Sequence, residues 1–177
     1  MGSWSDWDVS DVILSTDTYV SPPSSLKSYG GHAFLKESVV NDDLSEGQAV
    51  FWIKLASALS WIKFAFRHQG DLASSDEFVV SFEVHYDGTW IVIRKQDIVI
   101  KDIHYSFDYD SWQKFRVTWW VSESHLIIRV EHYKDGQWVK KIEYSTENTW
   151  SNGGRVGFRL YSGSGPVYVD DFSLYVA

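Results

Sequence analysis

Glu83 and His85 are the two side chains whose types and spacing come nearest to acid–base chemistry. They lie two residues apart at the end of an alternating segment, in which Phe78, Val80, Phe82 and Val84 face the other way, so an extended backbone places both on one face. A double-displacement hydrolase needs a second carboxylate about 5.5 Å from the first, and no second carboxylate shares their register. The pair is therefore predicted to be the solvent-facing side of a half-buried strand, and no catalytic residue is assigned.

Cationic and aromatic side chains recur on the faces opposite the apolar residues of their segments. Lys63, Arg116 and Arg159 follow this parity. So do the residues that, with His85, form the candidate ligand-binding set: Arg67, Arg94, Trp120, Arg129 and Tyr161. Arginine forks suit carboxylates and aromatic rings suit sugar faces, which favours a glycan, acidic glycans included. The alternative is cross-strand pairing with Glu83 and Glu131, worth roughly a few tenths of a kcal/mol per pair.

Trp119 and Trp120 are adjacent, so they cannot both face the core of a regular strand. One of the two rings is expected on the outer face, where it would be a platform for a ligand. The alternative is a ring covered by residues 99–110, which are rich in Tyr and Phe.

The segments that carry these residues alternate with a period of two and end at turn signals such as Asp87-Gly88 and Asp135-Gly136. Residues 49–66 are interpreted as two strands and a turn, with a short helical turn near Ser57 as an alternative. The other expected strands lie within residues 78–84, 90–93, 115–121, 126–130, 138–144, 156–161 and 167–176. The pattern predicts an all-β chain, an antiparallel two-sheet β-sandwich of the jelly-roll type.

Composition supports this fold and limits the partners. Ten Trp, ten Tyr and ten Phe in 177 residues suit a pleated, half-buried surface, and the length predicts a single domain, residues 1–177. A net charge of −8 disfavours nucleic acid as a partner. The lack of cysteine excludes disulfides and thiolate metal sites, and no apolar run is long enough for a transmembrane segment.

Several segments resemble the concanavalin A-like lectin/glucanase superfamily and its carbohydrate-binding modules. Trp7-Asp8-Val9-Ser10, followed by the small-residue loop and Ser-Leu strand of residues 15–27, is similar to their first strands. Residues 112–119, with the Asp135-Gly136 turn downstream, resemble a strand that precedes a hairpin. Residues 154–160 and 167–174 are similar to the last two strands. The resemblance spans most of the chain, and its motifs specify fold better than ligand.

The resemblance implies a non-catalytic, lectin-like domain that binds a polysaccharide or other glycan, and it favours an extracellular or surface location. It also implies a structural calcium. Asp170 and Asp171, completed by Asp8, Asp17 and Ser21, would supply the carboxylate and carbonyl oxygens that calcium prefers.

Two alternatives from other classes stay open. The first is an enzyme of the same fold, a glycoside hydrolase or a polysaccharide lyase. The Glu-x-Asp-x-x-Glu strand motif of the superfamily's glucanases is absent, but a lyase could use the basic and tyrosine side chains to neutralise a uronate and abstract its proton. Those side chains are Arg67, His85, Arg94, Arg129 and Tyr161. The second alternative is a structural or adhesive surface protein, such as a virion subunit.

Overall fold

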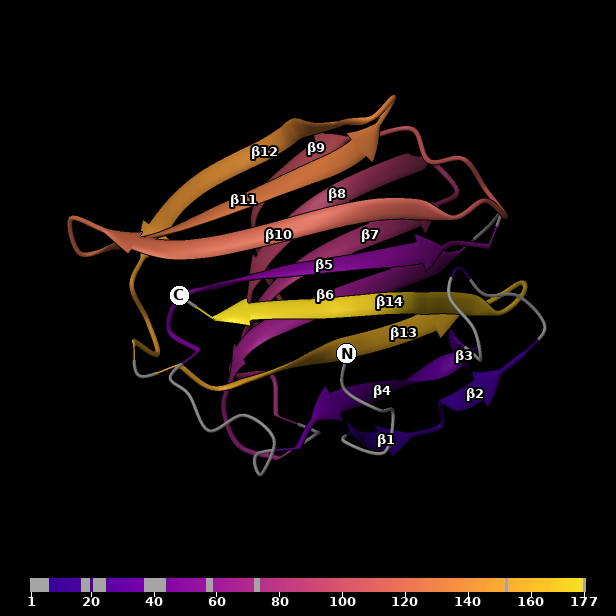
Figure 1. Ribbon diagram of the computed structural model, residues 1–177, viewed down its shortest axis with the longest axis horizontal. Coiled ribbons are helices and arrows are strands. Elements are labelled where there is room, and N and C mark those ends of the chain that lie inside the picture. Colours follow the sequence, from indigo (N-terminus) through magenta and orange to yellow (C-terminus); the bar gives the residue numbers. More distant parts are fainter. Residues whose placement is uncertain are drawn as a thin grey trace.

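The chain folds as two packed antiparallel sheets, as the alternating pattern predicts (Figure 1). The structure is a computed structural model that describes residues 7–16, 20, 25–36, 44–56, 59–71, 74–151 and 153–176. Within these residues every regular element is a strand, and no helix is long and apolar enough to cross a membrane.

Sheet A has seven strands, which in spatial order are β1 (Trp7–Ser10), β4 (Gly30–Leu35), β13 (Arg155–Ser162), β6 (Ser60–His68), β7 (Phe78–His85), β8 (Gly88–Lys95) and β9 (Ile98–His104). Sheet B also has seven, in the order β12 (Gln137–Glu147), β11 (His125–Lys134), β10 (Gln113–Ser122), β5 (Gly47–Lys54), β14 (Val167–Val176), β3 (Ser25–Ser28) and β2 (Ile13–Ser15). The fold is an all-β sandwich of the jelly-roll kind, as predicted.

The core between the sheets is built from the aromatic residues that alternation points inward. Phe51 of sheet B packs on Phe64 of sheet A with 5.3 Å between ring centroids, and Phe82 packs on Phe115 at 4.5 Å. Burying each such side chain contributes about 1.5–3 kcal/mol. Trp119 also lies in this core, fully buried, so the structure confirms that Trp119 and Trp120 face opposite sides.

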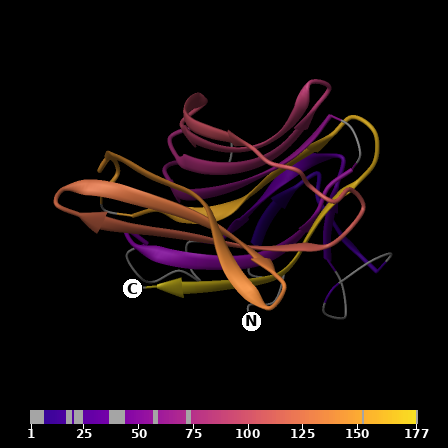
Figure 2. The ribbon, with the colours of Figure 1, turned by 90° about the horizontal axis from the view of Figure 1, so that it is seen from above.

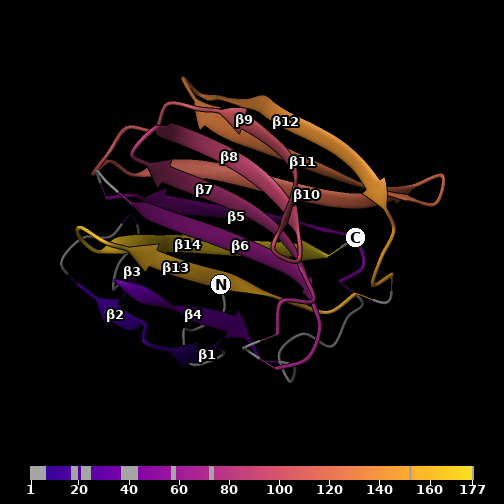
Figure 3. The same ribbon diagram turned by 180° about the vertical axis from the view of Figure 1, so that it is seen from behind.

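Sheet A is curved, and its concave side faces away from sheet B (Figure 2). Figure 3 looks onto this concave outer face. Its floor includes a second apolar cluster of Phe34, Ala65 and Val79, separate from the main core. Gly157 makes room for it, because a Cβ there would come within 2.5 Å of the Phe34 ring. The concave face of sheet A therefore has an apolar cluster of its own, on β4, β6 and β7, besides the core between the sheets.

Two ambiguous segments are resolved by the topology. Residues 49–66 contribute β5 and β6, as two strands on different sheets, whereas Ser57 lies outside the described residues. The stretch 99–110 does not cover Trp120: its first part is strand β9 of sheet A, and Phe107 then packs into the core against Phe115.

Candidate functional site

The candidate ligand residues do not converge on one face. Arg94 (β8), His85 (β7) and Tyr161 (β13) lie on strands of sheet A, whereas Trp120 (β10) and Arg129 (β11) lie on sheet B. Trp120 points away from the core, and the Arg129 guanidinium lies 5.0 Å from its ring centroid. Because the sheets pack face to face, the outer faces of A and B are on opposite sides of the molecule.

Arg67 was expected on a polar face, and this expectation is wrong. Its side chain is fully buried, and its φ of 53° is left-handed. The β13 register shifts opposite this point, so two residues of β6 face one of β13. This bulge reverses the side-chain alternation, and Arg67 turns inward while His68 packs against Phe34 of the outer cluster at 4.4 Å.

The guanidinium of Arg67 ties two loops together. Nε and Nη2 donate to the Ser45 carbonyl, and Nη1 donates to Asn148 Oδ1 at 2.6 Å and to the Thr149 carbonyl at 3.0 Å. Through these contacts Arg67 stabilises the packing of the two loops at one end of the sandwich. The lyase arrangement is therefore not assembled, because Arg67 is buried and Arg129 lies on the other sheet.

Glu83, His85 and Arg94 do come together, on the concave face of sheet A. His85 Nε2 lies 2.8 Å from Glu83 Oε2, and Arg94 Nη2 donates to Glu83 Oε1 at 2.9 Å. Burial by itself would raise the pKa of Glu83, but the hydrogen bonds from His85 and Arg94 outweigh it and hold that pKa below its usual value. Glu83 is thus an ionised acceptor that positions His85 and Arg94, which does not suit a general acid.

A shallow pocket of about 260 Å³ opens beside this cluster. Apolar surface from Trp90, Val92 and Val99 is combined there with the carboxylates of Asp87 and Asp102. The remaining lining residues are Glu83, His85 and Arg94. Among the residues that line the pocket, carboxylates outnumber guanidinium groups three to one.

The strand register places two aromatic pairs on either side of Glu83. Trp61 and Trp90 are its cross-strand partners on β6 and β8. Trp61 stacks on Tyr161 with 5.5 Å between ring centroids and a 22° interplanar angle, and Trp90 meets His104 edge to face at 5.1 Å. Since strands lie about 4.8 Å apart, the two tryptophan backbones are about 10 Å apart across the face.

Lys63 completes this surface, with its ammonium 4.6 Å from the Trp61 centroid. Burial lowers the pKa of Lys63, and the nearby Arg94 charge lowers it further. Neither Trp61 nor Trp90 belongs to the candidate set from the sequence. The sequence does indicate their position, because Trp61 and Trp90 are adjacent to the core residues Ile62 and Ile91, so their side chains must face outward.

The arginines are all engaged within the protein, which removes the expected guanidinium forks for an acidic ligand. Arg129 pairs with Glu143 at 2.5 Å and Arg116 with Glu131 at 2.6 Å, both on sheet B. On sheet A, Arg155 pairs with Asp8, and Arg159 pairs with Glu77, whose Oε2 also lies 2.8 Å from His68 Nδ1. Cross-strand pairing with Glu83 and Glu131, the alternative interpretation, is what the contacts of Arg94 and Arg116 show.

The expected calcium ligands fit poorly where they are described. Asp8 forms an ion pair with Arg155 at 2.6 Å. Both carboxylate oxygens of buried Asp170 accept backbone N–H groups, from Val20 at 2.6 Å and from Asp171 at 2.7 Å. Among the described residues no group of three or more His, Asp or Glu side chains could hold a metal ion. Asp17 and Ser21 lie outside the described residues.

Comparison with solved structures identifies the fold. No protein family matches the sequence, and no curated protein is similar to it in sequence. The carbohydrate-binding module CBM66 from Bacillus subtilis superposes with a TM-score of 0.63 at 10% identity, covering 96% of this chain and 95% of that one. The winged bean acidic lectin, solved with methyl-α-D-galactose, gives a TM-score of 0.68 at 9% identity, with 96% and 91% covered.

The exoplasmic/lumenal domain of VIP36 in its Ca²⁺-bound form is a third match, with a TM-score of 0.65 at 12% identity and coverage of 97% and 84%. At these identities the likeness concerns the backbone fold, and it agrees with the resemblance found in the sequence. The chain therefore has the concanavalin A-like lectin fold.

Proposed function

We propose that the protein is a non-catalytic glycan-binding domain that holds a neutral saccharide on the concave face of sheet A. The observation that carries the proposal is the pocket beside Trp90, where an aromatic ring, apolar side chains and several carboxylates meet around the Glu83 cluster. Ligand sites in proteins combine apolar walls with a few fixed polar groups in this way. The lectin-like fold supports the same function by analogy.

Each part of the surface suits a part of a sugar. The rings of Trp61 and Trp90 offer platforms for the apolar faces of two saccharide units. Asp87 and Asp102 would accept hydrogen bonds from hydroxyl groups, and His85 and Arg94 would donate. Because Glu83 holds the last two side chains in place, little conformational entropy is lost when a ligand binds.

The charge of the pocket argues for a neutral ligand. Three carboxylates line it against one guanidinium, and that guanidinium already pairs with Glu83. A uronate carboxylate would therefore enter a negative field without a free cationic partner in the pocket, which disfavours its binding.

The test is calorimetric titration of neutral and acidic oligosaccharides into the wild type and three alanine variants. Trp90→Ala and Trp61→Ala should each raise the Kd for a neutral glycan about tenfold, since a lost stacking contact costs about 1–1.5 kcal/mol. Trp120→Ala is the matched control, a half-buried tryptophan on the opposite sheet, and should change the Kd less than about twofold. Equal losses in all three variants, or no heat from any neutral glycan at millimolar concentration, would contradict the proposal.

A further inference from the structure

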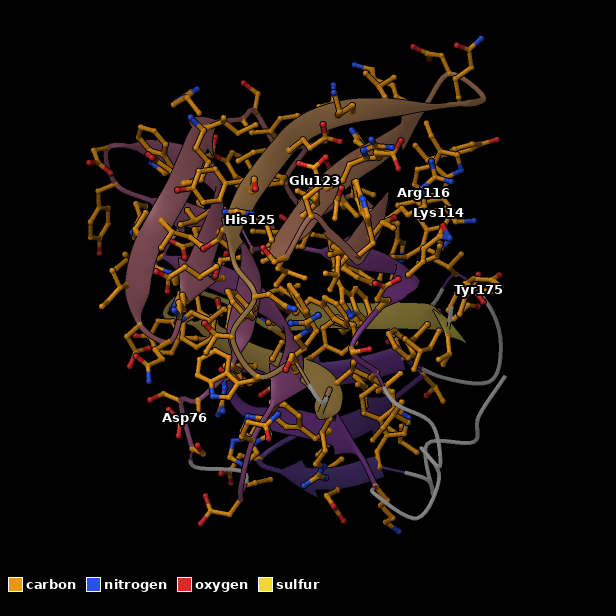
Figure 4. All side chains as sticks on the ribbon, turned by 90° about the vertical axis from the view of Figure 1, so that its left-hand side faces the viewer. Asp76, Lys114, Arg116, Glu123, His125 and Tyr175 are labelled. Carbon is orange, nitrogen blue, oxygen red and sulfur yellow. The ribbon has the colours of Figure 1, made fainter. Side chains whose placement is uncertain are left out.

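The outer face of sheet B carries an array of aromatic rings and lysines that the concave site does not use. One row of the register joins Trp52, Lys114, Tyr133 and Trp138 across β5, β10, β11 and β12. The Lys114 ammonium lies 5.4 Å from the Trp52 centroid and 5.7 Å from that of Tyr133. Figure 4 shows Lys114 next to Arg116 on the side of the molecule away from Asp76, which lies in the loop between β6 and β7 of sheet A.

Lys54 extends this array along β5. It lies two residues from Trp52 and so on the same face, and its ammonium is 5.5 Å from the Tyr168 ring of β14. Since Lys114 pairs with Trp52, Lys54 and Lys114 are diagonal neighbours, about 7–8 Å apart in their backbones. We call Trp52, Lys54, Lys114, Tyr133 and Trp138 the lysine–aromatic patch.

The lysines of this patch differ from the arginines in how they are paired. In the described parts of the chain neither Lys54 nor Lys114 has a carboxylate within ion-pair distance, whereas Arg116 and Arg129 on the same face are paired with Glu131 and Glu143. The carboxylate of Asp170 faces Trp52 in the register, but it is buried and accepts backbone N–H groups. Two unneutralised cations are thus held on ring faces in a protein of net charge −8.

We propose that the lysine–aromatic patch is a second binding site, for an anionic polysaccharide chain whose charge comes from uronate carboxylates or sulfates. Lys54 and Lys114 would pair with anionic groups of the chain, and the rings of Trp52, Tyr133 and Trp138 would contact its sugar rings. The patch complements the concave pocket, whose negative field favours neutral saccharides. It stands independently of the proposed function, because its residues lie on the other sheet.

A nucleic acid fits this surface less well. Phosphate backbones draw their affinity from many clustered cations, and here two lysines stand in a net negative protein. A lysine ammonium that lies over a ring can still pair with a carboxylate or sulfate on the side that faces away from the ring.

The experiment compares polygalacturonate with its fully methyl-esterified form, which has the same sugar chain without the charge. Calorimetry at low and high salt should give binding of polygalacturonate that weakens as salt rises, and at least about tenfold weaker binding of the ester. Dextran sulfate against dextran repeats the comparison for sulfate, and a single-stranded oligonucleotide tests the rival polyanion.

The variants separate the patch from general charge effects. K54Q/K114Q should lose about tenfold or more in affinity for polygalacturonate, and K54R/K114R should retain it. K95Q/K101Q removes the same charge from sheet A and should change the affinity less than about twofold. Equal loss in K95Q/K101Q, equal binding of the ester, tighter binding of the oligonucleotide, or loss of polygalacturonate binding in Trp90→Ala would each overturn the proposal.

Discussion

Replacement of Arg67 by glutamine tests whether this residue holds the sandwich together or contacts a ligand. The guanidinium donates to the Ser45 carbonyl, to Asn148 Oδ1 and to the Thr149 carbonyl. Arg67→Gln leaves these three acceptors with at most a shorter, neutral donor. Hydrogen bonds from a charged donor contribute about 1.5–3 kcal/mol each, but the acceptors are only partly buried and regain some water.

The expected loss of unfolding free energy is therefore about 2–4 kcal/mol, well below the sum of the separate bonds. For a chain of this length each kcal/mol lowers Tm by about 2–4 °C, so Arg67→Gln should lower Tm by about 4–16 °C. Circular dichroism during thermal and urea unfolding measures both quantities. Arg116→Gln is a control, because its single ion pair with Glu131 lies on a partly exposed face and should cost about 1 kcal/mol or less.

Glycan titration below the melting range completes this test. A folded Arg67→Gln protein should bind the neutral glycan with unchanged affinity, since Arg67 is fully buried and contacts only protein. A variant with wild-type stability that has lost glycan binding would refute this reasoning, and it would restore Arg67 to the ligand set that the strand parity first suggested.

Two further outcomes are expected. The pKa of Glu83 in the folded protein lies below its unfolded-state value of about 4.5, so the ionised Glu83 stabilises the fold fully above about pH 4.5, and this stabilisation is lost as pH falls through the lower, folded-state pKa. Glu83→Gln should therefore reduce the dependence on pH of the unfolding free energy, measured by urea unfolding between about pH 5 and pH 3. An unchanged dependence on pH would contradict the role of Glu83 as an ionised hydrogen-bond acceptor. For calcium, chelator and excess calcium should give the same melting curve, because Asp8 pairs with Arg155 and Asp170 accepts backbone N–H groups. Asp170→Asn should then lower stability by about 1–2 kcal/mol in either buffer, whereas a calcium-dependent rise in Tm that Asp170→Asn abolishes would support the calcium site that the resemblance implies.

Strand positions and inward-facing residues were accessible from sequence because alternation is a local property. Residues 78–84 and 115–119 place every second side chain in the core of the structure, and hairpin turns such as Asp135-Gly136 mark where strands reverse. No long-range information is needed for this, since the period of two follows from the extended backbone itself.

The site was less accessible, for two physical reasons. The alternation of side chains along a strand indicates that Trp120 and Tyr161 face outward. It does not indicate which sheet each strand joins, because that depends on pairing between segments distant in sequence: β10 pairs with β5 and β11, and β13 pairs with β4 and β6. Parity also fails beyond a bulge, as at Arg67, where one extra residue exchanges the faces of its neighbours. Neither effect leaves a local mark in the amino-acid order.

The pairing of charges explains how one acidic chain presents two chemically different surfaces. On sheet A, Glu83 and Glu77 neutralise Arg94 and Arg159, so the acids at the pocket rim, Asp87 and Asp102, set the local field. On sheet B the carboxylates of Glu131 and Glu143 pair with arginines, and Lys54 and Lys114 lie over aromatic rings. Since local fields act over about one Debye length, roughly 8 Å at physiological salt, each face responds to its own unpaired charges more than to the total of −8. Binding of an anionic chain to the lysine–aromatic patch should therefore weaken as salt rises, whereas binding of a neutral saccharide to the concave pocket should change little with salt.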